Sequence, residues 1–399
     1  MSVNEDLHHT FPLCRQLMRL VGVWPDPDAP LSDFGRPNLR FIVTVCILIM
    51  YVYVPQFMNA IRSWGNVELM IQYIASVNFS FLACCKLIVT RYHGETLRTL
   101  MTSYRTDWIT AKRNWERNTM LKLARTGRSI SFSCYTSLIC AISLYVYINL
   151  LKFYRNISQS ERKLIYQFDY PYDMQKTSYY VITYFIQISG GMYVAMINST
   201  VDIFVALLLL HVCAQLINLR TALNDLVEKL AEKSIPSAKF KEGITAIVLR
   251  HESLIRNAKT IDNCYSTVLL VQMMAATFQL CFESFQVYTG MIDKNSERST
   301  IKIAFLICYV TLLLLDAYVY CYAAERLLIE STAIAYGAYE CKWYDIPSRD
   351  ARDLMFIVYR SMIPLKLTAG KFGIFSIEMF GMTVKTSMGY LSMLLAINN

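Results

Sequence analysis

The sequence predicts an all-α membrane protein with seven transmembrane helices, a cytoplasmic N-terminus, an extracellular C-terminus and a helical cytoplasmic anchor region. Hydrophobic residues make up 55% of the 399 residues, charged residues make up only 17%, and the mean hydropathy is +0.33. Soluble domains are about 45–50% apolar and about 25% charged. This composition excludes an ordinary soluble enzyme and a disordered regulator.

Seven segments meet the requirement for a spanning helix, which is about 20 mainly apolar residues. They are residues 41–61, 68–89, 130–153, 179–217, 264–288, 301–324 and 367–397. The fourth segment is far longer than a bilayer requires, which indicates that it tilts strongly or continues into the cytoplasm. The chain thus divides into an N-terminal arm (1–40), six helices (41–324), an anchor segment (325–366) and a seventh helix (367–399).

Lysine and arginine are unequally distributed between the two sides of these spans. The N-terminal arm and the connections on its side hold 28 of them, and the opposite connections hold 9. Cytoplasmic connections are enriched in these residues, so the arm is predicted to be cytoplasmic. The net charge of +9 then reflects membrane orientation, and no nucleic-acid partner is predicted. Asn156, in the sequon Asn156-Ile157-Ser158 on the outer side, is a candidate for glycosylation, although so short a motif also occurs by chance.

Helical periodicity also occurs outside the predicted spans. Apolar residues recur with a period of 3.6 over residues 221–233 and 244–261, and a further helix is predicted over 350–362. These helices are expected to extend the membrane bundle into the cytoplasm. Residues 12–21 are predicted to form a short helix at the membrane interface, with Arg15 and Arg19 facing water.

Motifs that carry enzymatic chemistry are missing from the sequence. The 12 cysteines are scattered, without a C-x-x-C pair, and no catalytic or phosphate-binding signature is present. We therefore predict no enzyme activity, no metal site and no cofactor. Charged residues inside a membrane are costly, and we interpret Asp202, Glu283 and Asp316 first as partners in hydrogen bonds between helices.

The seventh segment carries a stripe of polar and small residues. At 100° per residue, its members lie within about 60° of one another. They are Glu378, Lys385, Gly389, Ser392 and Ala396. Such a stripe needs water or protein beside it. It either lines an aqueous pore or is buried at the centre of the bundle, and the periodicity alone leaves both interpretations open.

Large apolar and aromatic side chains gather in the predicted outer halves of the second to sixth segments. They are Tyr73, Val77, Tyr145, Met192, Tyr193, Met196, Phe278, Phe282, Phe285 and Tyr309. A cavity lined by such residues suits a small volatile or lipid-like ligand. The alternative for each residue is an ordinary place in the bundle core or in an interfacial aromatic belt.

Several short motifs resemble those of the insect odorant receptor family over nearly the full length of the chain. They are Gly22-Val23-Trp24-Pro25, Ala335-Tyr336, Trp343-Tyr344, Pro347, Arg360, Pro364, Leu367, Ala369-Gly370-Lys371-Phe372, Ser376, Phe380, Lys385-Thr386-Ser387 and Tyr390. The resemblance implies a seven-helix subunit of a tetrameric, ligand-gated, non-selective cation channel in the plasma membrane of sensory neuron dendrites. It also implies that a small hydrophobic odorant binds in the outer half and that the cytoplasmic helices hold the subunits together.

The resemblance further implies where the pore and its partner lie. The seventh helix would line the path of the permeating cations, and the family's apolar gate carries over to Met393 and Ile397, beside Ser392 and Ala396 of the stripe. The short connection over residues 220–259 resembles ligand-tuning subunits, which form a heterotetramer with the odorant receptor co-receptor (Orco) in the lipid bilayer. A metabotropic seven-helix chemoreceptor and, less favoured, a membrane transporter are the alternatives.

Overall fold

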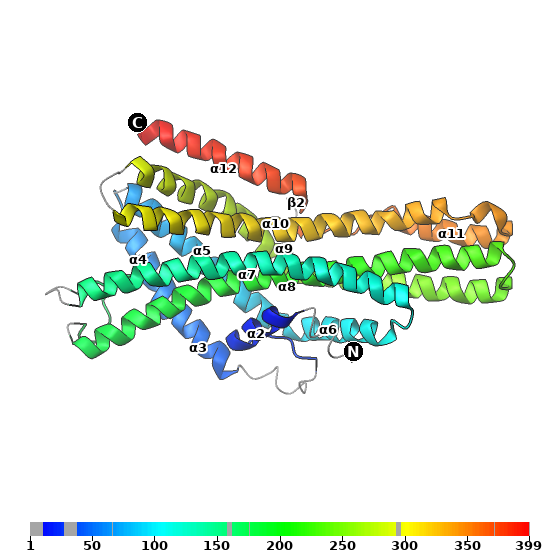
Figure 1. Cartoon of the computed structure of the whole chain (residues 1–399), viewed down its shortest axis with the longest axis horizontal. Coiled ribbons are helices and arrows are strands. Elements are labelled where there is room, and N and C mark those ends of the chain that lie inside the picture. Colours follow the sequence, from blue (N-terminus) through cyan, green and yellow to red (C-terminus); the bar gives the residue numbers. More distant parts are fainter. Residues whose placement is uncertain are drawn as a thin grey trace.

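The computed structural model of the chain describes residues 11–27, 38–65, 67–157, 162–174, 176–292, 297–370 and 372–398. Long helices run side by side along one axis, as Figure 1 shows, and several of them extend well past the others at one end. The first part of the chain forms α2 (Pro12–Val21), α3 (Leu39–Ile47), a π-helical turn η2 (Leu48–Tyr53), α4 (Val54–Arg62), α5 (Val67–Tyr92), α6 (Gly94–Thr110) and α7 (Asn114–Asn156). The second part forms α8 (Thr177–Ala231), α9 (Ser237–Ile292), α10 (Glu297–Glu340), η3 (Trp343–Asp345), α11 (Ser348–Ser361), β1 (Thr368–Ala369), β2 (Gly373–Ile374) and α12 (Ile377–Asn398).

The membrane-spanning part is helical throughout, as predicted. Among the described residues, six stretches are long and apolar enough to cross a membrane, namely Leu39–Arg62, Leu69–Tyr92, Asn114–Asn156, Thr177–Ala231, Ser237–Met291 and Thr300–Asp345. The first combines α3, η2 and α4. Pro55 lacks the N–H that would complete the regular helical ladder, which accounts for the local π-helical turn before it. The seventh helix, α12, has 22 residues, a length of about 33 Å that also suits a bilayer.

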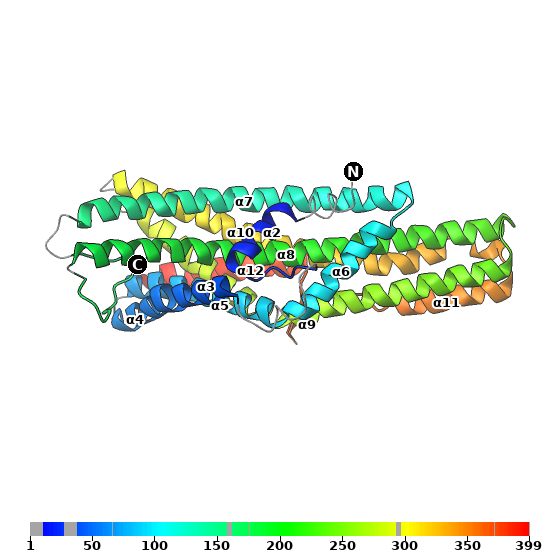
Figure 2. The ribbon, with the colours of Figure 1, turned by 90° about the horizontal axis from the view of Figure 1, so that it is seen from below.

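Several helices, α7 to α10, are far longer than a bilayer requires. α8 has 55 residues, which corresponds to about 80 Å of helix against about 30 Å of hydrocarbon. The periodic segments 221–233 and 244–261 are therefore not separate helices, because the first is the end of α8 and the second lies inside the unbroken α9. The extension consists mainly of α8, α9, α10 and α11 (Figures 1 and 2) and corresponds to the predicted cytoplasmic anchor region.

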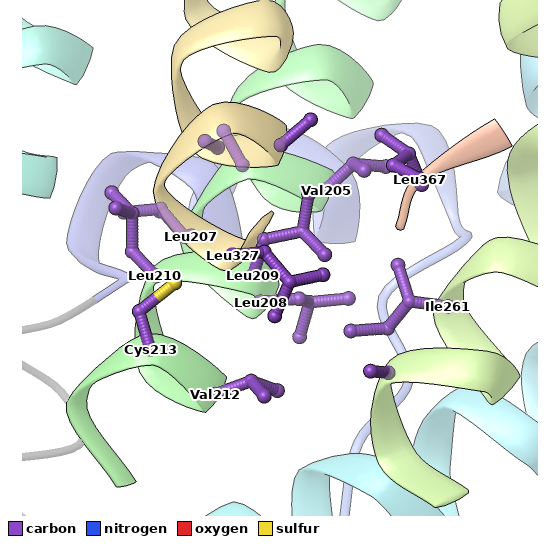
Figure 3. Close-up of a cluster of buried hydrophobic side chains, with 14 of the residues drawn as sticks. Val205, Leu207, Leu208, Leu209, Leu210, Val212, Cys213, Ile261, Leu327 and Leu367 are labelled. Carbon is purple, nitrogen blue, oxygen red and sulfur yellow. The ribbon is translucent and has the colours of Figure 1, made fainter. Parts of the chain in front are cut away.

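The core of the molecule surrounds α8. Every side chain from Ile197 to Leu216 is buried, because this mainly apolar stretch is enclosed by other helices. Its polar residues, such as Asp202, find hydrogen-bond partners on those helices. Figure 3 shows Val205 and Leu208 of α8 packed close to Ile261 of α9 and Leu327 of α10. This central rod links the membrane part to the cytoplasmic part in one continuous hydrophobic core.

The prediction that the seventh helix begins at residue 367 is wrong. Thr368–Ala369 and Gly373–Ile374 instead pair as two short antiparallel strands, with Thr368 opposite Ile374, and the helix starts at Ile377. Asp262 of α9 accepts hydrogen bonds from the Thr368 N–H at 2.7 Å and from its hydroxyl at 2.9 Å. Gly370, with a φ of 56°, makes the turn. These contacts keep the segment out of the helix.

Candidate ligand cavity and polar helix

A cavity of about 550 Å³ lies between α5, α7, α8 and α10, in the predicted outer half of the bundle. We call it the outer cavity. Four aromatic side chains meet along its wall. The Tyr309 ring lies edge-on to Phe79, with the ring centres 5.2 Å apart, and stacks on Phe305 at 5.9 Å. Phe305 in turn lies 6.4 Å from Tyr145. The wall is thus a continuous aromatic surface suited to an apolar ligand.

Hydrogen bonds hold this aromatic wall in place. The Gln279 amide of α9 donates to the Tyr309 hydroxyl at 2.7 Å, and the Ser80 hydroxyl donates to the Gln56 carbonyl oxygen at 2.7 Å. Gly191 of α8 allows Tyr145 to approach, since a Cβ at this glycine would lie 2.4 Å from the Tyr145 hydroxyl. Because these partners come from six helices, the shape of the cavity depends on how the helices pack together.

The connection between α7 and α8 covers the outer cavity. Tyr166 of this connection lines the cavity, and Gln187 of α8 holds it by two bonds to the backbone. The Tyr166 N–H donates to the Gln187 side-chain oxygen at 3.1 Å, and the Tyr166 carbonyl accepts from its amide at 2.9 Å. Burial raises the pKa of Tyr166 above its ordinary value, so its hydroxyl remains protonated near neutral pH.

Polar and charged side chains form one side of the same cavity. Lys152, Arg155 and Lys302 line it from exposed positions on α7 and α10, whereas Glu283 of α9 is buried. The Gln286 amide donates to the Glu283 carboxylate at 3.4 Å. The cavity can therefore hold an apolar body against the rings and a polar group near this side.

The structure separates the predicted ligand-contacting residues into two groups. Three line the outer cavity: Tyr73, Tyr145 and Tyr309. Seven described residues do not line it: Val77, Met192, Tyr193, Met196, Phe278, Phe282 and Phe285. Helical periodicity shows which residues share a face, but it does not show which way that face is turned. Phe79, Phe305 and Tyr166 were missed; aromatic character could have suggested the first two.

The buried charges beneath the outer cavity form a cluster that links four helices. Lys86 of α5 lies 2.8 Å from the Asp202 carboxylate of α8 and donates to the Asn198 carbonyl at 3.1 Å. Gln272 of α9 donates to Asp202 at 2.6 Å. Asp316 of α10 accepts from the hydroxyl of Ser199, at 2.8 Å. We call these residues the Lys86 cluster.

This cluster agrees with the interhelical hydrogen bonds predicted for Asp202 and Asp316. Lys86, however, is one of the 28 Lys and Arg residues assigned from the sequence to the cytoplasmic side, in the connection between the second and third spans. The structure places it inside the bundle, buried, so it does not contribute to the cytoplasmic excess of Lys and Arg. The remaining excess is large enough that the predicted orientation is unchanged.

On α12 the polar stripe is exposed on the surface of the chain. Glu378, Lys385 and Gly389 are exposed, as are Ser392, Met393 and Ala396, whereas Thr383 and Ser387 are buried. The exposed stripe therefore faces away from the bundle core, and the interpretation that it is buried at the bundle centre does not hold within this chain. The side chain of Ile397, and Lys371 before the helix, lie outside the described residues.

α12 packs against the bundle through aromatic contacts as well. The ring of Tyr390 stacks on Phe278 of α9, with centres 5.9 Å apart and planes 7° from parallel. Phe380 lies edge-on to Tyr318 of α10, also at 5.9 Å. Through these contacts α12 packs directly against α9 and α10.

The predicted glycosylation residue Asn156 is the last residue of α7. Its amide donates to the Lys163 carbonyl at 3.1 Å, and Ser158 of the sequon lies outside the described residues. Glycosylation at this residue remains a prediction.

Known proteins that resemble this chain share one family. The model of the 7tm odorant receptor family matches residues 66–388. Odorant receptor 13a of Drosophila melanogaster is 24% identical over 96% of this chain and 95% of its own length. The odorant receptor coreceptor of Anopheles gambiae is 27% identical, but over only 37% of this chain and 30% of its own.

A solved structure shows the same fold. The insect olfactory receptor OR5 from Machilis hrabei, in complex with eugenol, superimposes with a TM-score of 0.83, covering 99% of this chain and 100% of that chain, at 13% identity. The family model covers most of the sequence, and the chain is a multi-pass membrane protein. The chain therefore belongs to the odorant receptor family, and its function is that of an odorant receptor.

Proposed function

We propose that this receptor is a subunit of a ligand-gated, non-selective cation channel, in which an odorant binds in the outer cavity and α12 lines the ion path. The observation that carries the proposal is a chain of contacts between the two. Tyr309 lines the cavity and accepts a hydrogen bond from Gln279 of α9. Phe278, the residue before Gln279, stacks on Tyr390 of α12.

The outer cavity suits a small and mainly apolar odorant. Its volume of about 550 Å³ lies within the range of about 300–1,000 Å³ that is usual for small-molecule sites. The stacked rings of Tyr309 and Phe305 favour an aromatic or aliphatic body. The related fold of OR5 was solved with eugenol, a small molecule, which supports this use of the fold.

Opening would follow from a small movement of α9. A ligand that presses on Tyr309 displaces Gln279, and the same helix carries Phe278 against α12. An odorant that binds the open arrangement more tightly than the closed one shifts the population toward the open channel. Glu378 and Ser392 on the exposed stripe would then face the water-filled pore.

The channel would be a heterotetramer with the odorant receptor co-receptor in the plasma membrane. In the extension of the bundle, exposed apolar side chains give this chain a surface for such assembly. They include Tyr336, Tyr339, Tyr344, Met355, Phe356, Tyr359, Met362 and Ile363. Exposed apolar patches of this kind mark protein–protein contacts.

Substitution of Tyr145 tests the site. Tyr145→Ala enlarges the outer cavity, and Phe282→Ala is the matched control, since Phe282 does not line the cavity. With the co-receptor present, Tyr145→Ala should change the half-maximal concentration of at least some odorants about tenfold and alter their rank order. The permeability ratio of the channel should stay constant, because the pore is unchanged.

The control should keep the rank order of the parent chain. If Tyr145→Ala leaves the potency of every odorant unchanged, the outer cavity is not the odorant site.

A further inference from the structure

A second cavity, of about 630 Å³, lies at the junction of α2, α3, α5 and α6. These elements meet about midway along the molecule (Figure 2). Thr90 and Arg91 of α5 line it, whereas Tyr73 and Ser76 of the same helix line the outer cavity. The nearest lining residues of α5 are Ser80 and Thr90, so at 1.5 Å per residue the two cavities are about 15 Å apart along this helix. The second cavity is therefore a separate site near the predicted cytoplasmic face of the membrane.

The lining of this cavity is strongly basic. Among the described residues, Arg19, Arg40 and Arg91 line it together with the carboxylate of Asp26, which forms an ion pair with Arg19. Guanidinium groups bind phosphate oxygens through paired hydrogen bonds and remain charged at every physiological pH. Three of them around one concave surface, against one acid among the lining residues that the structure describes, favour an anionic ligand.

Two helices begin at the same cavity. Asn38 precedes the first turn of α3, and Gly94 is the first residue of α6; both residues line the cavity, and neither helix has a side-chain cap. Free N–H groups in a first helical turn bind phosphate. Two of the carbonyls at the end of α2, where the helix dipole would repel an anion, accept hydrogen bonds within the chain: Arg19 from the Gly22 N–H and Met18 from the Val23 N–H.

The motif Gly22-Val23-Trp24 builds one wall of this cavity. Gly22 has a φ of 80° and lies close to α3, since a Cβ there would be 3.0 Å from the Phe41 nitrogen and 3.4 Å from the Arg40 Cβ. Trp24 packs on Phe204 of α8, with ring centres 5.9 Å apart. The motif therefore anchors α2 to the core and places Arg40 at the cavity.

The outer flank of the cavity is apolar and exposed. Leu39 lines the cavity and is 76% exposed, and Ile42 and Val43 of the same helix and Ile88 of α5 are also exposed. Basic pockets between helices at the cytoplasmic face bind the headgroups of anionic lipids. A phosphate in the cavity would leave acyl chains beside these apolar residues, which favours a lipid over a free phosphate compound.

We propose that the arginine-lined cavity binds the phosphate-bearing headgroup of an anionic phospholipid of the inner leaflet, a phosphoinositide type of ligand. The proposal rests on the predicted orientation and is independent of the odorant site.

Binding of a short-chain lipid to the full-length chain tests the proposal. The chain is placed in nanodiscs of phosphatidylcholine, and fluorescent dioctanoyl phosphatidylinositol 4,5-bisphosphate is titrated against it. Arg40→Gln with Arg91→Gln should weaken binding about tenfold or more, because charge-assisted contacts are lost. Arg40→Lys with Arg91→Lys should weaken it less, since charge is kept and only the paired geometry is lost.

The matched control is Lys122→Gln with Arg125→Gln, which removes the same charge from exposed positions of α7 and should leave binding within about twofold, because screening weakens distant surface charges. A double arginine variant that binds like the control overturns the proposal. Equal binding of a short-chain phosphatidylcholine by the parent chain also overturns it. This comparison uses only the unchanged chain, so it does not depend on whether a variant folds. Equal binding of soluble inositol trisphosphate would overturn the lipid assignment in favour of a free phosphate ligand.

Discussion

At the scale of single residues, the Lys86 cluster places three ionisable side chains inside the bundle, where charge is costly. Lys86, Asp202 and Asp316 are all buried, so one ammonium group faces two carboxyl groups. Lys86→Met would remove the only cation that contacts Asp202 among the described residues. Removing one partner of a buried pair costs about 3–5 kcal/mol, and we expect a lower melting temperature and reduced surface expression.

A second substitution distinguishes charge from packing. Lys86→Met combined with Asp202→Asn removes both charges and keeps an acceptor for the Gln272 amide, so it should recover part of the lost stability. If Lys86→Met alone melts at the temperature of the parent chain, the ion pair does not stabilise the bundle.

The sequence identified the acids of this cluster but not its cation. Asp202 and Asp316 stand out because they interrupt long apolar stretches. Lys86 lies near the end of its span, where a lysine is ordinarily read as a cytoplasmic residue. Only the packing of α5 against α8 shows that its ammonium group turns inward, to the Asn198 carbonyl and Asp202.

At the scale of one helix, α12 presents the same stripe that its periodicity predicts, but its start could not be predicted. The stripe depends on residue spacing within the helix, which the sequence contains directly. The hairpin before it depends on Asp262, which lies on α9 and bonds Thr368 from 106 positions away in the chain. Long-range contacts of this kind override a locally apolar segment.

Substitution of Met393 tests whether α12 lines the ion path. Its side chain is 64% exposed beside the polar stripe, where an apolar group narrows and dries a pore. Met393→Ala, expressed with the co-receptor, should alter ion selectivity or raise the resting conductance. Met388→Ala is the control, since Met388 is also exposed but lies about 140° around the helix from Met393. Unchanged currents in Met393→Ala would remove this residue from the gate.

At the scale of the whole molecule, the predicted orientation separates a channel subunit from a metabotropic receptor. The excess of Lys and Arg places the N-terminus in the cytoplasm, and seven crossings then place the C-terminus outside. An epitope tag after Asn399 should be stained on intact cells, and a tag before Met1 should be stained only after permeabilisation. The reverse pattern would contradict the orientation and favour the metabotropic alternative.

The fold class and the long cytoplasmic extension follow from composition and periodicity, but the outer cavity does not. To predict the cavity, one must know how each surrounding helix is rotated about its own axis. One must also know where Tyr166, in the connection between α7 and α8, is placed. Both depend on contacts between distant residues, such as the hydrogen bonds of the Gln187 side chain to the Tyr166 backbone. No local sequence pattern links these two residues. Apolar and aromatic character in the predicted outer halves therefore found three of the lining residues, but it could not show which way the other side chains face.

Assembly is the last property that belongs to the whole molecule. α11 buries Leu354 and Ile357 against the chain, yet Phe356 and Tyr359 on its other side are 71% and 75% exposed. A helix with apolar residues on two faces needs a second partner, and we assign that partner to a neighbouring subunit. Phe356→Ser with Tyr359→Ser should greatly reduce co-purification with the co-receptor, because buried aromatic residues dominate interface energies.

The stability of the chain itself should change little in this double variant, because both side chains are exposed in the isolated chain. Leu249→Ser, at an exposed apolar position of α9, is the matched control and should co-purify normally. Normal recovery of the co-receptor with the α11 variant would show that this surface is not the subunit contact. Loss of recovery together with an unchanged melting temperature would assign the lost energy to the contact between subunits rather than to the fold of one chain.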